Sequence, residues 1–226
     1  MSRKPRRSPG RPPAGERTGE EAKETLIRTA ATLFARQGFE GTSLREVAEG
    51  ARVTPAMVAY YFRDKSGLLE AVVRQGLSIL LTVVRAAAAE AEPGQFLSTL
   101  VRDYMAALTR HPWIPQVVVR EVVSRESPLR QLFIDEFAVH AVQLIPRQMA
   151  TGIEAGFLRE DLDPRFAILS LVGMCLFPFI AHPVLGPLLG YRLDEGFGHT
   201  YGAHVLELFQ HGAVARFDDP EEAGGA

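Results

Sequence analysis

The spacing of apolar residues is helical almost throughout the chain. Leu26, Ile27, Ala30, Leu33 and Phe34, for example, recur three or four positions apart, as on one face of an α-helix. No strand-turn alternation and no repeat stands out. The pattern therefore predicts an all-α fold, with helices at about residues 19–37, 43–50, 54–62, 64–91, 95–110, 114–124, 128–155, 164–181 and 194–212.

Breaking and capping residues set several of these boundaries. Gly38 is expected to end the first helix. Thr42 or Ser43 caps the second, and Glu46, three residues after Ser43, completes a capping box. Thr54 caps the third helix, which begins with a proline, at a position where the missing N–H has no consequence.

Three later segments contain residues that favour more than one kind of structure. The run 116–123 is rich in valine, which favours strands, but a lone strand would have no partner and we predict a helix. Pro146 should kink or divide the helix in which it lies. The run 166–191 contains no Asp, Glu, Lys or Arg, and a membrane-spanning helix needs about 20 apolar residues. Prolines and glycines interrupt residues 166–191 from Pro178 onward. We therefore predict that this segment forms a buried helix and not a membrane segment.

Composition narrows the possible classes of protein. The 226 residues are 46% hydrophobic and 23% charged, as in ordinary soluble globular proteins. The net charge of −2 argues against a uniformly basic coat protein for nucleic acid. Residues 1–70 nevertheless carry 13 Lys and Arg against 9 Asp and Glu, whereas residues 71–226 carry 12 against 18. The single cysteine, Cys175, excludes an internal disulfide and a Cys-based zinc cluster, and its apolar neighbours predict a small buried hydrophobe.

The segment from Gly38 to Lys65 has the dimensions of a helix-turn-helix motif, with two short helices that follow a longer one. The second short helix of such a motif lies in the major groove of DNA. Small or polar residues at its start let the backbone approach base edges, and flanking donors bind phosphates. The residues suited to the first role are Thr54, Pro55, Ala56 and Met57, and those suited to the second are Ser43, Arg45, Tyr60, Tyr61 and Lys65. Three packed helices without a DNA role are the alternative.

In this stretch the sequence resembles the TetR family of bacterial transcriptional regulators. The match covers about residues 20–70 and departs from the family at Ala59, where an aromatic residue is frequent. The resemblance implies a homodimer that binds a roughly palindromic operator through the residues just named, with Arg45 as the guanine reader. The matching segments are LFARQGF (33–39), GTSLREVA (41–48), VTPAMV (53–58), YYF (60–62) and DKSGLL (64–69).

The chain is expected to divide into four parts. These are a disordered basic arm (1–18), the helix-turn-helix domain (19–65), a helical ligand-binding and dimerisation domain (66–215) and a flexible acidic tail (216–226). The arm lacks the apolar stretch of a secretory signal. Its Gly10-Arg11-Pro12 sequence resembles the core of AT-hook peptides, which implies that Arg11 enters an A·T-rich minor groove. A solvated basic tail is the alternative.

The family resemblance also implies a small-molecule pocket and a dimer surface. Bulky apolar residues between positions 95 and 155 are expected to bind a hydrophobic or cationic ligand. The expected pocket residues are Phe96, Tyr104, Met105, Trp113, Phe133, Phe137 and Met149. The expected dimer residues, on the last two helices, are Phe166, Leu169, Val172, Leu176, Phe177, Val205, Leu208 and Phe209.

Enzyme and metal motifs do not compete with this interpretation. The sequence has neither a Gly-x-Ser-x-Gly elbow nor a His-Glu-x-x-His pair. His204 and His211 lie two turns apart, and the glycines of residues 196–202 lack the spacing of a nucleotide fingerprint. We predict no catalytic residue, metal, cofactor or membrane contact, and a cytoplasmic repressor that a small ligand releases from DNA. A ligand-binding protein with a vestigial DNA-binding head is the alternative.

Overall fold

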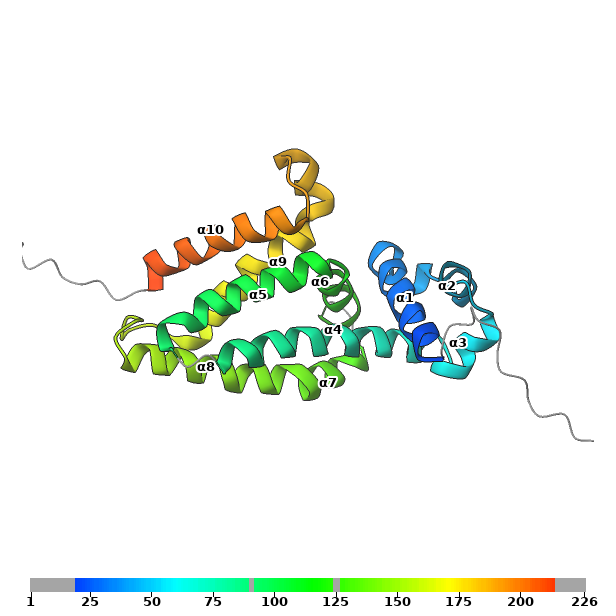
Figure 1. Cartoon of the computed structure of the whole chain (residues 1–226), viewed down its shortest axis with the longest axis horizontal. Helices are drawn as coiled ribbons and strands as arrows, with labels where there is room; N and C mark the ends of the chain where they lie inside the picture. Colours follow the sequence, from blue (N-terminus) through cyan, green and yellow to red (C-terminus); the bar gives the residue numbers. More distant parts are fainter. Residues whose placement is uncertain (1–18, 90–91, 124–126, 214–226) are drawn as a thin grey trace, which may run out of the picture.

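The computed structural model describes residues 19–89, 92–123 and 127–213. Within these ranges the chain forms helices and no strand, so the all-α prediction is confirmed. Figure 1 shows a small head formed by α1, α2 and α3, and a larger body that the long helix α4 joins to it. The predicted basic arm with Arg11 and the predicted acidic tail lie outside the described residues. The helices are α1 (Gly19–Gly41), α2 (Leu44–Ala51), α3 (Pro55–Phe62), α4 (Lys65–Ala88), η1 (Pro93–Gln95), α5 (Phe96–Arg110), α6 (Trp113–Val118), η2 (Val119–Val123), α7 (Leu129–Phe133), η3 (Ile134–Ala138), α8 (Val139–Glu154), α9 (Pro164–Leu189) and α10 (Glu195–Ala213).

Local sequence explains how the helices of the head begin and end. Helical geometry breaks at Gly38, whose φ of 77° suits glycine, and one further turn then leads to Gly41. Ser43 caps α2 through the predicted capping box, in which its hydroxyl accepts from the Glu46 N–H and its own N–H donates to the Glu46 carboxylate. Thr54 occupies the N-cap position of α3, as predicted, although its side chain makes no capping hydrogen bond.

Two hydrophobic cores meet along α4. The core of the head combines α1, α2 and α3 with the first half of α4, and it also takes in Val117 and Val122 from the body. The core of the body combines the second half of α4 with α5, α8, α9 and α10. Trp113, at the start of α6, packs against both cores. The head is therefore tied to the body through α4 and through the segment around α6.

Two predicted helices contain a π-helical turn. In the first, α6 passes into the π turn η2, and in the second, α7 passes into the π turn η3 before α8 begins. Such turns hold an extra residue, and they are frequent at functional sites. The valine-rich run 116–123 is helical, as predicted. Pro146 lies inside α8 and does not divide it.

Helix α9 departs furthest from the prediction. It continues to Leu189 instead of ending near residue 181, although Pro178, Pro183 and Pro187 lie inside it and each removes a backbone hydrogen bond of the helix. Both α4 and α9 are long and apolar enough to cross a membrane, but half of the apolar window of α4 is buried in the protein, against 22% of that of α9. The prediction of a buried helix is therefore wrong for the single chain. The large exposed apolar residues of α9 are Phe166, Leu169, Phe177, Ile180, Val184, Leu188 and Leu189.

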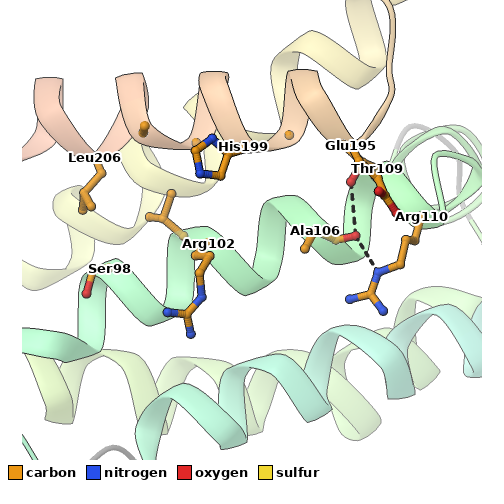
Figure 2. Close-up of a pocket in the computed structure, with 12 residues that line it drawn as sticks. Ser98, Arg102, Ala106, Thr109, Arg110, Glu195, His199 and Leu206 are labelled. Carbon is orange, nitrogen blue, oxygen red and sulfur yellow. Dashed lines mark hydrogen bonds between the residues drawn. The ribbon is translucent and has the colours of Figure 1, made fainter.

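Two glycines let α10 approach α5 closely. A Cβ atom at Gly198 would lie 2.7 Å from Cγ2 of Thr109, and one at Gly202 would lie 3.2 Å from another side chain of α5. Gly198 and Gly202, two of the three glycines of residues 196–202, thus serve helix packing. Figure 2 shows the groove of about 540 Å³ beside this contact, where Thr109 and Arg110 donate to the carbonyl of Ala106 over 3.2 and 3.0 Å.

Candidate nucleic-acid interface and ligand cavity

Helix α3 exposes its start and buries its opposite face. Thr54, Pro55 and Ala56 are exposed to solvent, whereas Val58 and Phe62 are packed in the core of the head. The buried pair fixes the orientation of the helix, and the small exposed residues leave its backbone free to approach another surface. This is the geometry that entry into a major groove requires. The contact of these residues with DNA stays a prediction.

Aromatic side chains extend the exposed surface of α3. The Tyr60 side chain is 82% exposed, and its ring meets that of the half-buried Tyr61 edge to face, with 5.0 Å between the centroids. Met57 is half-buried beside the exposed start of the helix. A large aromatic ring that is held in place but uncovered is suited to contact a partner surface, as predicted for Tyr60.

The start of α2 presents two further predicted residues. Ser43 and Arg45 are both exposed. The Ser43 hydroxyl accepts a hydrogen bond from the backbone N–H of Glu46 in the capping box, and its contact with a phosphate stays a prediction. The N–H and hydroxyl of Ser43 both bind Glu46 and lower the pKa of its carboxyl, so the cap is fully formed at neutral pH.

Lys65 has an internal role that differs from the prediction. Its ammonium donates to the carbonyl oxygens of Phe39 and Thr42 over 2.9 and 3.1 Å, and it lies 4.3 Å from the centroid of the Phe39 ring. These bonds join α4 to the corner between α1 and α2. The structure thus gives Lys65 a structural role that uses two of its three N–H donors, and its contact with a phosphate stays a prediction.

Sequence reasoning missed two arginines at the ends of α2 and α3. Arg52 directly follows α2 and Arg63 directly follows α3, and both are exposed. Among the described residues they are the ones other than glycine with a positive φ, at 56° and 67°. Their charges are suited to phosphate contacts. The sequence signal that could have identified them is that an arginine closely follows each of the two predicted short helices.

A buried carboxylate connects the body with the head. Glu121, in the π turn η2, is 5% exposed and accepts a hydrogen bond of 3.1 Å from the backbone N–H of Phe39. The carbonyl of the same residue binds Lys65. The corner between α1 and α2 is therefore held from α4 and from η2 together. Sequence reasoning missed Glu121, although a charged pair inside a valine-rich run could have pointed to it.

An apolar cavity of about 480 Å³ lies in the body between α4, α5, α6, α8 and α9. Its lining is almost wholly aliphatic and aromatic and contains no Asp or Glu. The one charged residue of this lining, Arg165, is paired with Asp163 over 2.6 Å. Burial raises the pKa of Tyr104, and it raises that of Cys175 to about 12, so both are neutral at physiological pH. The cavity suits an apolar ligand, and the cationic alternative finds no counter-charge there.

The structure brings three of the seven predicted pocket residues together at this cavity, and their contact with a ligand stays a prediction. Tyr104, Phe133 and Phe137 line the apolar cavity. The prediction is wrong for the other four residues. Phe96, Met105 and Met149 are buried in the core of the body, and Trp113 lines a different groove. Cys175 is buried, as predicted.

The predicted dimer residues fall into three groups. Phe166, Leu169, Phe177 and Leu208 are exposed, and they remain available for a partner. Val172 and Leu176 are half-buried at the wall of the apolar cavity. Val205 and Phe209 are buried in the core of the body, so the prediction is wrong for this pair. Both lie on the side of α10 that its glycines bring against α5.

Comparison with known proteins identifies the chain. Residues 26–72 match the profile of bacterial regulatory proteins of the tetR family, and residues 93–202 match that of the tetracyclin repressor-like C-terminal domain. The chain is 33% identical over 113 residues to the HTH-type transcriptional regulator YttP of Bacillus subtilis, which is 49% of this chain and 55% of YttP. It is 27% identical over 161 residues to the HTH-type transcriptional repressor KstR2 of Rhodococcus jostii, which is 69% of this chain and 78% of that protein.

The fold agrees with these sequence matches. The solved structure of the ketosteroid transcriptional regulator KstR2 of Mycobacterium tuberculosis superposes with a TM-score of 0.68 at 19% identity, and it covers 90% of this chain and 99% of that one. Together the two matched profiles cover most of the head and most of the body. The chain therefore belongs to the TetR family of bacterial transcriptional regulators, and its head is a helix-turn-helix DNA-binding domain.

Proposed function

We propose that the protein is a homodimeric repressor of the bacterial cytoplasm that binds a palindromic operator and is released by an apolar small molecule. The observation that carries this proposal is the exposed start of α3, held in place by Val58 and Phe62 on its buried face. No catalytic residue or cofactor is needed. Two copies of α3, one from each protomer, would occupy the two half-sites.

The exposed side of α9 supports the homodimer. Monomeric soluble proteins rarely leave a long contiguous apolar surface uncovered, and α9 exposes large apolar side chains along most of its length. A second copy related by a two-fold axis would cover the same residues on both protomers. Leu208 of α10 is also exposed and would extend this face.

The apolar cavity supports release by a ligand. A ligand shifts the protein between two states only by the difference in its affinity for them. The wall of the cavity includes Val119 and Val123 of the π turn η2, and the same turn carries Glu121, which holds the Phe39 N–H of the head. A molecule that fits the cavity best when η2 is displaced would therefore favour a different position of the head.

Arg45→Ala and Tyr60→Ala are each expected to weaken specific DNA binding by about tenfold or more. A bidentate pair of arginine and guanine contributes about 1–3 kcal/mol of discrimination. Gel shifts with DNA from upstream of the protein's own gene, at near-physiological salt, measure the effect. Because both side chains are exposed, melting temperature and sedimentation should not change.

Arg85→Ala, at an exposed position of α4, is the matched control for these variants and should bind DNA like the unmodified protein. If the unmodified protein gives no specific band, the vestigial-head alternative is favoured. If Arg45→Ala or Tyr60→Ala changes the sedimentation of the protein, its effect on DNA binding reflects misfolding.

Ala141→Trp is expected to fill the apolar cavity and to weaken the binding of Nile red, an uncharged apolar dye, by about tenfold. Ala141 is half-buried and lines the cavity, and the larger side chain would take up space that the dye needs. Dye fluorescence measures the affinity. Ala86→Trp, at an exposed position of α4, should leave it unchanged. Equal dye binding by both variants would place the dye site elsewhere.

A further inference from the structure

A second groove, of about 1160 Å³, lies between the head and the body. Four arginines line it: Arg28 and Arg36 from α1, Arg110 from the end of α5 and Arg120 from η2. No Asp or Glu lines the groove, although the whole chain carries a net charge of −2. The four positive charges therefore converge on one surface from three separate segments of the chain.

In the described ranges of the chain the four guanidinium groups make no close ion pair, and the acidic neighbour that acts on one of them is Glu46, whose carboxyl pKa Arg36 helps to lower. Within the part of the chain that the structure describes, none of them has an ion pair within 4.0 Å. Two of the arginines donate hydrogen bonds to uncharged groups. Arg110 donates to the Ala106 carbonyl over 3.0 Å, and Arg28 donates to the Thr25 hydroxyl over 3.5 Å. Like charges repel one another when they gather in this way, and a bound anion would relieve the repulsion.

Flat and apolar side chains form much of the rest of the groove, together with the polar side chains of Thr32, His111 and Gln116. Pro112, Val119 and the half-buried Trp113 line it from the side of α6, and Ile180 and Pro183 line it from α9. A flat ring could lie against the indole of Trp113, since aromatic rings stack readily. The groove thus combines a surface for a planar ring with guanidinium groups, which bind phosphate through paired hydrogen bonds.

We propose that this groove binds a nucleotide with two or more phosphate groups, its phosphates between the arginines and its base against Trp113. The site goes beyond the proposed repressor function and does not depend on the apolar cavity. It is also distinct from the exposed surface of α2 and α3, which is proposed to contact DNA. No residue of these two helices lines the groove, and Figure 1 shows α6 and α3 on opposite sides of α1 in this view. Because α9 forms one wall, the full-length protein in its native oligomeric state is the form to test.

Trp113 is the only tryptophan of the chain, so intrinsic fluorescence reports on the groove directly. We expect ADP to change this fluorescence in a saturable manner at constant ionic strength. Tripolyphosphate should compete with ADP, and adenosine, which has no phosphate, should bind at least about tenfold more weakly. The double substitution Arg28→Gln and Arg110→Gln should weaken ADP binding by about tenfold or more, since it removes two charged donors that would bind phosphate oxygens.

The matched control is the double substitution Arg85→Gln and Arg147→Gln, which removes two exposed charges from α4 and α8 and should leave ADP binding unchanged. Arg110→Gln alone carries the test if the groove double variant melts at a lower temperature. The proposal is overturned if ADP gives no saturable change, or if sulfate at equal ionic strength reproduces it. Equal losses in the groove and control variants would also overturn it. So would a fluorescence change with random duplex DNA but not with ADP, which would make the groove a DNA contact.

Discussion

Replacing Leu169 and Phe177 by glutamate is expected to turn the protein into a monomer and to weaken operator binding by roughly 100-fold. The two side chains are 69% and 59% exposed on α9, and burying a side chain of this size contributes about 1.5–3 kcal/mol. In a two-fold interface each substitution occurs on both protomers, so its loss of burial energy is doubled. Each new carboxylate also adds a desolvation penalty. A monomer would also hold the operator through one recognition helix instead of two.

Analytical ultracentrifugation over a range of concentrations measures the first effect, and gel shifts measure the second. Ala150→Glu, which adds a carboxylate at an exposed position of α8, should remain dimeric and bind DNA normally. Circular dichroism should show that the α9 variant keeps its helices. A variant that still sediments as a dimer would refute α9 as the dimer face, and the exposed apolar side of α9 would then need another partner.

The head could be predicted from sequence because its features depend on near neighbours. The capping box joins Ser43 and Glu46, three residues apart, and the stop at Gly38 depends on one residue. The internal role of Lys65 could not be predicted in this way. Its partners, Phe39 and Thr42, lie on another helix corner more than twenty residues earlier, and nothing in the local pattern states that the corner will reach the ammonium.

Predictions for the body failed where the result depends on which way a helix faces. Val205 and Leu208 are both apolar and lie three residues apart on α10, yet one is 1% exposed and the other 55%. The close approach at Gly198 and Gly202 sets this rotation. The π turns have a similar consequence, because an extra residue in a turn rotates everything that follows. This helps explain why composition alone could not separate pocket residues such as Phe137 from core residues.

Glu121→Ala is expected to uncouple the head from the apolar cavity. The substitution leaves the N–H of Phe39 without its partner, at a cost of about 1–3 kcal/mol if that group stays buried. Val119 and Val123, on either side of Glu121 in the same π turn, line the cavity, so a displacement of the turn is passed to the head through this hydrogen bond. Glu121→Gln retains an acceptor oxygen and should keep most of the coupling.

Two measurements test this route. Hydrogen exchange at the Phe39 amide should be faster in Glu121→Ala than in Glu121→Gln. In a double-mutant cycle, Ala141→Trp, which fills the cavity as a ligand would, should weaken operator binding on its own and have little further effect when combined with Glu121→Ala. Equal effects of Ala141→Trp with and without Glu121→Ala would show that the cavity reaches the head by another path, and α4, which contributes to both cores, would be the element to test next.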